Sequence, residues 1–187
     1  GDHATAIRIF EELLDENPSL TVAYIGIGVA YEDLGEFERA EPAFERATRL
    51  DPRNYEAQLG HGEVLQVLGK LRDAIRAYQQ ALSIDPESVD ALVGMSSAFL
   101  GLDMASNAIA PAERAVVLSP DDGRARADLG EAYMRVKRIE DAIESFEIAL
   151  ELLGNEPAVI RSLVECYSRE DRFAEAINAG QVLISIE

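Results

Sequence analysis

The chain has 187 residues and a formal net charge of −18, from 35 acidic and 17 basic side chains. This charge repels phosphate backbones, which argues against nucleic acid as a partner and favours basic peptides, although it also serves simply to keep an elongated helical protein in solution. The single cysteine, Cys166, excludes an internal disulfide, and no apolar run is long enough to insert into a membrane.

Residues 1–20 predict one amphipathic helix and the turn that follows it. One helical face carries the apolar side chains of Ala6, Ile9, Phe10, Leu13 and Leu14. The Asn17-Pro18 pair ends the helix, because the residue before a proline is driven out of the helical region. Gly1 stands where the next two repeats have Gly35 and Gly69 at their turns, so we interpret residues 1–20 as the second helix of a truncated repeat.

Residues 21–54 predict a pair of helices joined by a tight turn. The amphipathic stripe of the first helix consists of Tyr24, Ile27, Gly28 and Tyr31. Leu34-Gly35 ends this helix, with the glycine as its C-terminal cap. The apolar side of the second helix consists of Ala40, Phe44 and Ala47. Asp51-Pro52 ends the pair, and Asn54 is placed to cap the next helix.

The same pair of helices returns with a 34-residue period. The further copies are residues 55–88, 89–122, 123–156 and 157–187, and Ser88 and Asp122 are placed to cap helices as Asn54 is. One alanine position recurs in every second helix, as Ala6, Ala40, Ala74, Ala108, Ala142 and Ala176. A fixed period of this length is typical of a solenoid, so we treat residues 1–187 as a single array.

The copies differ from one another most in the later repeats. One second-helix position is aromatic in three complete repeats, as Phe44, Tyr78 and Phe146. Ala112 occupies it in the third complete repeat, which predicts weaker or different packing there. Gly180 occupies it in residues 157–187, and Val164 replaces the small residue of the first helix. We therefore expect the last repeat to be degenerate.

This pattern resembles the tetratricopeptide repeat family over the whole chain. In the first complete repeat the resemblance rests on Tyr24, Leu34-Gly35, Ala40, Phe44, Ala47 and Pro52. It implies an all-α fold, a right-handed superhelical solenoid of antiparallel helix pairs with a 34-residue period. The positions also have a physical reason of their own. Gly28 must be small where two helices approach most closely, and Phe44 fills the space between successive repeats.

The sequence contains no recognisable catalytic or metal-binding arrangement. It has no glycine-rich phosphate loop, no nucleophile elbow and no Cys/His spacing that would hold a metal. His61 stands in a packing position held elsewhere by Ile27 and Leu163, so we interpret it as a partly buried structural histidine. Cys166 stands where other repeats have alanine or valine, which predicts an inert buried thiol. We expect no enzyme activity, no cofactor and no metal.

The resemblance implies a binding site on the first helix of each repeat, because these helices line a concave groove in that family and bound peptides lie there. By repeat position the candidate peptide-binding residues are Val22, Ile25, Gly26, Val29, Leu59, Gly60, Glu63, Val93, Gly94, Ser97, Arg124, Asp128, Glu131 and Arg135. Gly26, Gly60 and Gly94 fall in one line, which predicts close approach of a ligand backbone. A simpler interpretation is that all these residues are ordinary groove lining and packing.

We therefore expect a non-catalytic, cytoplasmic scaffold that binds a protein or peptide partner with apolar anchors and basic residues. Two alternatives stay open. The terminal helices, residues 1–20 and 173–187, could pair between copies and make the chain a self-assembling homo-oligomer. The array could also be the regulatory or substrate-docking part of a larger enzyme, such as a transferase.

Overall fold

The computed structural model describes residues 2–186, so the turn predicted at Gly1 lies outside the described residues. Within this range the chain forms eleven α-helices and no strand. The helices are α1 (His3–Glu16), α2 (Thr21–Asp33), α3 (Phe37–Leu50), α4 (Tyr55–Val67), α5 (Leu71–Ile84), α6 (Val89–Gly101), α7 (Ala105–Leu118), α8 (Gly123–Arg135), α9 (Ile139–Leu153), α10 (Pro157–Arg169) and α11 (Phe173–Ile186). This confirms the all-α repeat fold.

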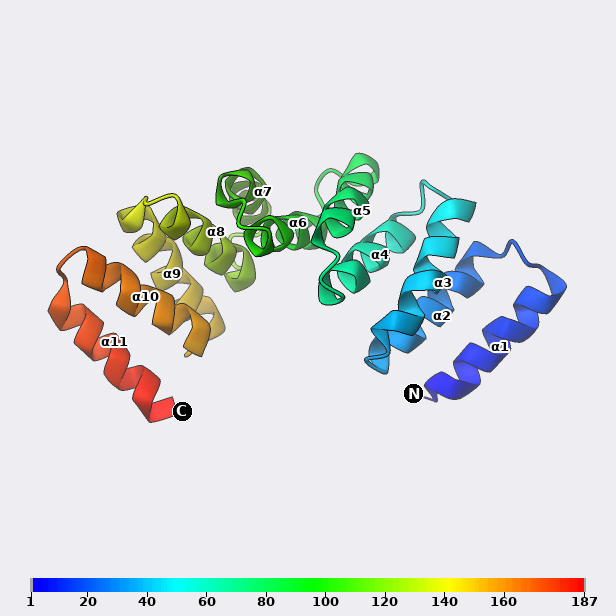
Figure 1. Ribbon diagram of the computed structural model, residues 1–187, viewed down its shortest axis with the longest axis horizontal. Coiled ribbons are helices and arrows are strands. Elements are labelled where there is room, and N and C mark those ends of the chain that lie inside the picture. The colour runs from blue at the N-terminus through cyan, green and yellow to red at the C-terminus, as the bar shows by residue number, and fades with distance from the viewer. Residues whose placement is uncertain (1, 187) are drawn as a thin grey trace. The chain divides into compact units, whose positions relative to one another are not determined.

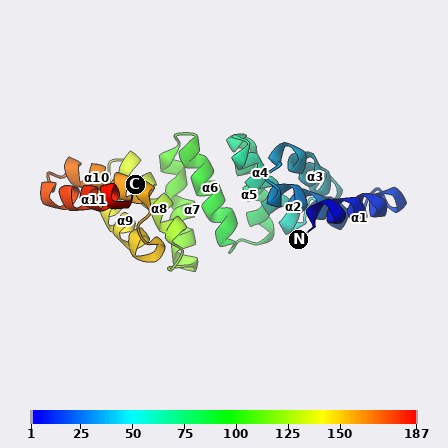
Figure 2. The same cartoon turned by 90° about the horizontal axis from the view of Figure 1, so that it is seen from below.

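The chain divides into two compact units, residues 1–98 and 99–187, and the division falls within α6. In the first unit each of α1 to α4 packs against the next helix, and α2 also contacts α4 directly (Figure 1). In the second unit α7 to α11 follow the same order, and α8 contacts α10. Figure 2 shows α7, α8 and α9 following one another in chain order within the second unit. Within each unit, therefore, the first helix of one repeat contacts the first helix of the next repeat.

The helices begin at the caps that the sequence predicts. The side chain of Asn54 accepts a hydrogen bond from the backbone N–H of Ala57 at 2.9 Å. Ser88 Oγ accepts one from the N–H of Ala91 at 3.1 Å. The Asp122 carboxylate accepts hydrogen bonds from the backbone N–H groups of Arg124 and Ala125, at 2.8 and 3.2 Å. Each cap satisfies a backbone donor that the first helical turn leaves without a partner.

The turn inside each helix pair needs a left-handed backbone. Gly35 and Gly69 have φ of +72°, and the equivalent residues Asp103, Lys137 and Asp171 have φ of 60°, 65° and 56°. The next residue's N–H closes the turn by bonding back to the helix, as Glu36 does to the carbonyl of Tyr31 at 2.9 Å. Glycine adopts this conformation without the steric cost that a side chain brings.

The core is built from aromatic rings that pack on glycines. The rings of Phe44, Tyr78 and Phe146 are at most 2% exposed. A Cβ atom added at Gly28 would lie 2.7 Å from the Phe44 ring, and Gly130 has the same relation to Phe146. This confirms that the first-helix glycines are small because the second helix packs closely against them.

The last repeat has fewer such contacts. A Cβ atom at Gly180 would meet no atom within 4 Å. On the same helix, α11, the side chains of Phe173, Ile177 and Ile184 are 59%, 60% and 79% exposed. The helix pair α10–α11 therefore forms, although α11 buries little of its apolar surface.

Candidate peptide-binding surface

The exposed face of α2 and α4 carries the predicted apolar anchors of the first unit. Val22 and Val29 lie two helical turns apart on α2 and are 66% and 44% exposed. Leu59 on α4 is half-buried, and Val67 at the end of α4 is 58% exposed. Ile25 and Val93 are only 8% exposed, so they belong mainly to the core. Apolar contact is therefore available chiefly on α2 and α4.

The glycine line of the first unit serves packing, which corrects the prediction made from sequence. A Cβ atom at Gly26 would overlap the ring of Phe10, one at Gly60 would lie 2.6 Å from the ring of Phe44, and one at Gly94 would overlap the ring of Tyr78. The preceding repeat's aromatic residue thus occupies the space beside each glycine. The expectation that these glycines let a ligand backbone approach is wrong, because that space is filled.

Carboxylates lie on α2 and α4, the two helices that carry the exposed valines. Asp33 Oδ2 lies 3.6 Å from His3 Nδ1, which links the end of α2 to the start of α1. Burial and the neighbouring charge of Asp33 raise the pKa of Glu32. Glu56 is exposed and Glu63 is half-buried on α4. The face is therefore both apolar and acidic, which is the combination that a basic, amphipathic segment complements.

The equivalent positions of the second unit are more polar, and their arginines are held by neighbours. Arg124 pairs with Asp122 at 2.9 Å. Arg135 pairs with Glu131 at 2.6 Å and also donates to the carbonyl of Leu100 at 2.9 Å. Arg135 therefore ties the end of α8 to the end of α6, and Asp128 and Glu131 on the same helix are half-buried. Sequence reasoning identified these charges but not their internal partners.

Neither nucleophilic nor metal chemistry is favoured by the described residues. Cys166 is fully buried, which confirms the expected burial of this residue, and burial raises the pKa of its thiol to about 11. Among residues 2–186 no group of three or more His, Cys, Asp or Glu side chains is arranged to hold a metal ion. No helix in this range has both the length and the apolar character needed to cross a membrane.

The structure forms two further pockets that the sequence did not reveal. One of about 330 Å³ lies between α3 and α5 over α4, and its lining is Glu41, Glu45, Gln58, His61, Leu65, Asp73, Arg76, Ala77 and Gln80. The other, of about 480 Å³, lies between α9 and α11 over α10, and its lining is Glu147, Leu150, Glu151, Leu163, Tyr167, Glu175, Asn178, Ala179 and Val182. Seven positions of the two linings correspond at three 34-residue periods, so the pockets are the same feature of the repeat in two units.

Tyrosine–glutamate pairs bridge successive repeats in the second unit. Tyr167 donates from its hydroxyl to Glu147 at 2.6 Å, and Tyr133 donates to Glu113 at 2.7 Å. Burial and the bonded Glu113 raise the pKa of Tyr133 to about 12, so the phenol keeps its proton. Arg138 lies 4.0 Å from the centroid of the Tyr133 ring and adds a cation–π contact. The same position is tyrosine in the first complete repeat, where Tyr31 instead accepts a hydrogen bond from Arg39 at 2.6 Å.

The comparisons with known proteins agree on one family and one fold. The sequence profile described as Tetratricopeptide repeat matches residues 25–89, 59–123 and 96–157. No curated protein matches the chain.

Solved structures resemble the chain over most of its length. YrrB, described as a TPR protein with an unusual peptide-binding site, superposes with a TM-score of 0.79 at 22% identity, over 95% of this chain and 92% of its own. MamA residues 41 to the end from Desulfovibrio magneticus RS-1 superpose with a TM-score of 0.81 at 22% identity, over 88% of this chain and 93% of the MamA chain. PilF of Pseudomonas aeruginosa superposes with a TM-score of 0.76 at 23% identity, over 88% of this chain and 75% of the PilF chain.

Proposed function

Because the chain belongs to the tetratricopeptide repeat family, whose members are generally non-catalytic scaffolds for protein or peptide partners, we propose that this protein binds a peptide segment of a partner on the exposed face of α2 and α4. The observation that carries the proposal is the exposure of Val22 and Val29 among carboxylates. A single exposed apolar side chain needs no explanation. Two of them in line on one helix, however, give the apolar side chains of a bound peptide two neighbouring contact points.

The peptide that suits this face is amphipathic and basic. Its apolar side chains would bury the two valines, and its lysines or arginines would lie near Asp33, Glu56 and Glu63. The similar fold of YrrB, described as having a peptide-binding site, supports a binding role for the fold but not the position of the site. Gly26, Gly60 and Gly94 contribute to the proposal only by holding α2, α4 and α6 in place.

In the second unit the proposed contact residues are Arg124, Asp128, Glu131 and Arg135. These side chains offer paired charges and no exposed apolar anchor. We propose that they contact polar groups of a peptide. These contacts should contribute less to the affinity than the contacts of the valines, because exposed charges form ion pairs of low net stability in water.

A fluorescence titration with a labelled helix-forming peptide of leucine and lysine tests the proposal. Val29→Glu should weaken binding about tenfold or more, since it places a charge against the apolar side of the peptide. Val117→Glu is the matched control, because Val117 is 77% exposed on α7 and the change in charge is the same. Equal affinity for both variants would contradict the proposal.

Self-assembly is a second candidate, and the exposed apolar side chains of α11 favour it. Phe173, Ile177 and Ile184 together leave more apolar surface in contact with water than any comparable stretch of α10. Sedimentation across a wide concentration range measures the association directly. A monomer at every concentration, or a dimer that persists in Ile184→Glu, would remove α11 from consideration.

A further inference from the structure

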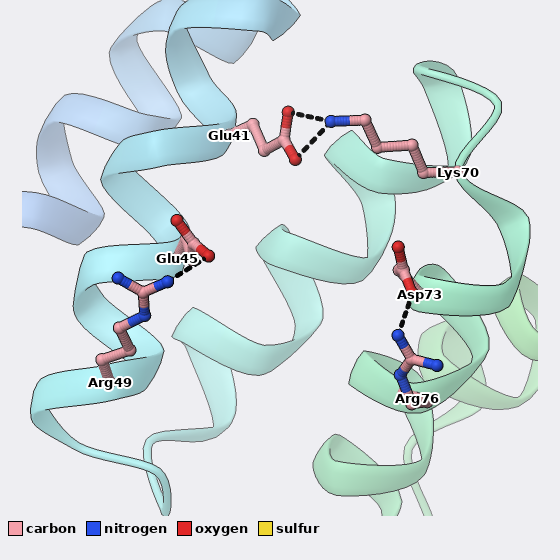
Figure 3. Close-up of polar contacts among 6 residues, drawn as sticks. All are labelled: Glu41, Glu45, Arg49, Lys70, Asp73 and Arg76. Carbon is pink, nitrogen blue, oxygen red and sulfur yellow. Dashed lines mark hydrogen bonds and ion pairs between the residues drawn. The ribbon is translucent and has the colours of Figure 1, made fainter.

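The pocket between α3 and α5 combines a polar floor with carboxylates on both walls. Glu41 and Glu45 come from α3, Asp73 comes from α5, and His61 lies on α4 between them. Figure 3 shows the three carboxylates on the two helices that flank α4. None of these residues takes part in the valine face of α2 and α4.

The equivalent pocket of the second unit shows that an imidazole at this position is not required by the fold. At matching positions, His61 corresponds to Leu163 and Leu65 to Tyr167, so the two pockets place their polar α4 and α10 side chains one turn apart. A leucine at the histidine position is what packing alone would favour. The α3–α5 pocket instead has the half-buried imidazole of His61 there.

His61 has an open hydrogen-bonding capacity that points into the pocket. The ring is half-buried, and among residues 2–186 it makes no hydrogen bond or ion pair. Burial lowers its pKa in spite of the nearby charges of Glu41, Glu45 and Asp73, so the ring is neutral at physiological pH. A neutral imidazole offers one donor and one acceptor without adding positive charge to the pocket.

Glu45 also lacks the partner that its counterparts have. In the second unit the glutamates at this position, Glu113 and Glu147, accept a hydrogen bond from a tyrosine hydroxyl. In the α3–α5 pocket the tyrosine is replaced by Leu65, which has no donor. Among the described residues the Glu45 carboxylate pairs only with Arg49 of its own helix, at 2.6 Å, and that arginine is 65% exposed. Such an i, i+4 pair contributes little and exchanges readily.

The chain's own lysine shows which chemistry these carboxylates bind. Lys70 Nζ lies 2.6 Å from each carboxylate oxygen of Glu41 and so joins the start of α5 to α3 (Figure 3). Asp73, by contrast, pairs with Arg76, which lies one turn along its own helix and is 73% exposed. A carboxylate has room for more than one donor, so Glu45 and Asp73 can still receive a cation from outside.

We propose that the α3–α5 pocket binds a basic side chain, arginine or lysine, of a partner protein, as a second docking point separate from the valine face of α2 and α4. The cation pairs with Glu45, which has no tyrosine donor in this repeat, and the neutral ring of His61 accepts one of its N–H groups. A guanidinium suits the pocket best because its several N–H groups reach a carboxylate and a ring nitrogen at once.

The test uses Nα-acetyl-arginine methylamide as the probe and the whole chain as the target, followed by the NMR signals of the His61 ring and of backbone amides in α3 and α5. We expect saturable shifts at these signals. The citrulline analogue has the same shape without the charge and should produce none at the same concentration. Equal shifts with citrulline, or no shift at His61 with arginine, would overturn the proposal.

Two variants locate the contact. Glu45→Gln should weaken arginine binding at least about fivefold, while Glu38→Gln, which removes an exposed charge elsewhere on α3, should leave it within twofold of the original chain. Leu65→Tyr restores the tyrosine of the other repeats, so it should fold and should also weaken binding by giving Glu45 an internal donor. If Glu38→Gln weakens binding as much as Glu45→Gln, the effect is one of net charge and the pocket is not the site.

Discussion

The two units build the same helix pair from different residues, and the differences lie at the positions that matter for stability and binding. The first unit uses Gly35 and Gly69 at its left-handed turns, whereas the second uses Asp103, Lys137 and Asp171. The first unit leaves valines exposed on α2, whereas the second holds its arginines in internal ion pairs. The repeat therefore tolerates substitution at the turns where another residue can adopt the left-handed backbone conformation. It also tolerates a charged side chain where a neighbouring side chain pairs with it.

The largest expected effect comes from removing an aromatic ring. Phe44 packs against Gly28 of its own repeat and Gly60 of the next, whereas Phe146 packs against Gly130 alone among the glycines. Phe44→Ala and Phe146→Ala should each lower the free energy of unfolding by about 3–5 kcal/mol, because both rings are almost fully buried and their removal leaves a cavity. Urea unfolding followed by circular dichroism measures both. A loss below about 1 kcal/mol for either variant would contradict this account of the core.

The next effect concerns the left-handed turns. Lys137→Gly should raise the free energy of unfolding by about 1 kcal/mol, since it removes the steric cost of a side chain at a φ of 65°. Asp103→Gly should raise the free energy of unfolding by less, because aspartate tolerates this conformation better than lysine does. Gly35→Ala is the reverse experiment and should be destabilising. Thermal unfolding of the three variants at one pH gives their order, and any other order would mean that the turn conformation is not the cause.

The smallest effect is expected from the histidine in the α3–α5 pocket. Burial lowers the pKa of His61 in the folded chain, so the unfolded chain binds more protons once the pH falls below about 6.5. Stability carried by the neutral ring is therefore present above that pH and lost as the pH falls. His61→Leu, which copies the residue of the second unit, should be more stable by about 0.5–1 kcal/mol and should lose less stability on acidification. Unfolding measured at pH 7.5 and pH 5.5 decides this, and an unchanged pH dependence would contradict it.

The helix pairs and their caps could be predicted because they depend on short stretches of sequence. Asn54, Ser88 and Asp122 cap their helices as expected, since a cap needs only a side chain placed before the first turn. The left-handed turns at Asp103 and Lys137 could not be recognised from residue type. They follow only from their alignment with Gly35, because the tertiary packing of the repeat sets the backbone there.

The glycine line was misinterpreted because a glycine does not reveal what lies beside it. Phe10, Phe44 and Tyr78 each stand sixteen residues before Gly26, Gly60 and Gly94, and each ring fills the space at its glycine. Where the aromatic residue becomes Ala112, the residue sixteen positions later is Asp128. This sixteen-residue spacing could therefore have indicated from the sequence that the glycines pack against aromatic rings. The pockets could not be predicted in the same way, because residues of three helices line each of them.

Chemical-shift mapping with the leucine–lysine peptide tests the central claim most directly. We predict that saturating peptide shifts the backbone amides around Val22 and Val29 on α2 and those on the exposed face of α4, and that Val29→Glu abolishes these shifts while Val117→Glu preserves them. Binding that leaves the α2 amides unshifted, or that survives Val29→Glu unchanged, would contradict the assignment of this face as the peptide-binding surface.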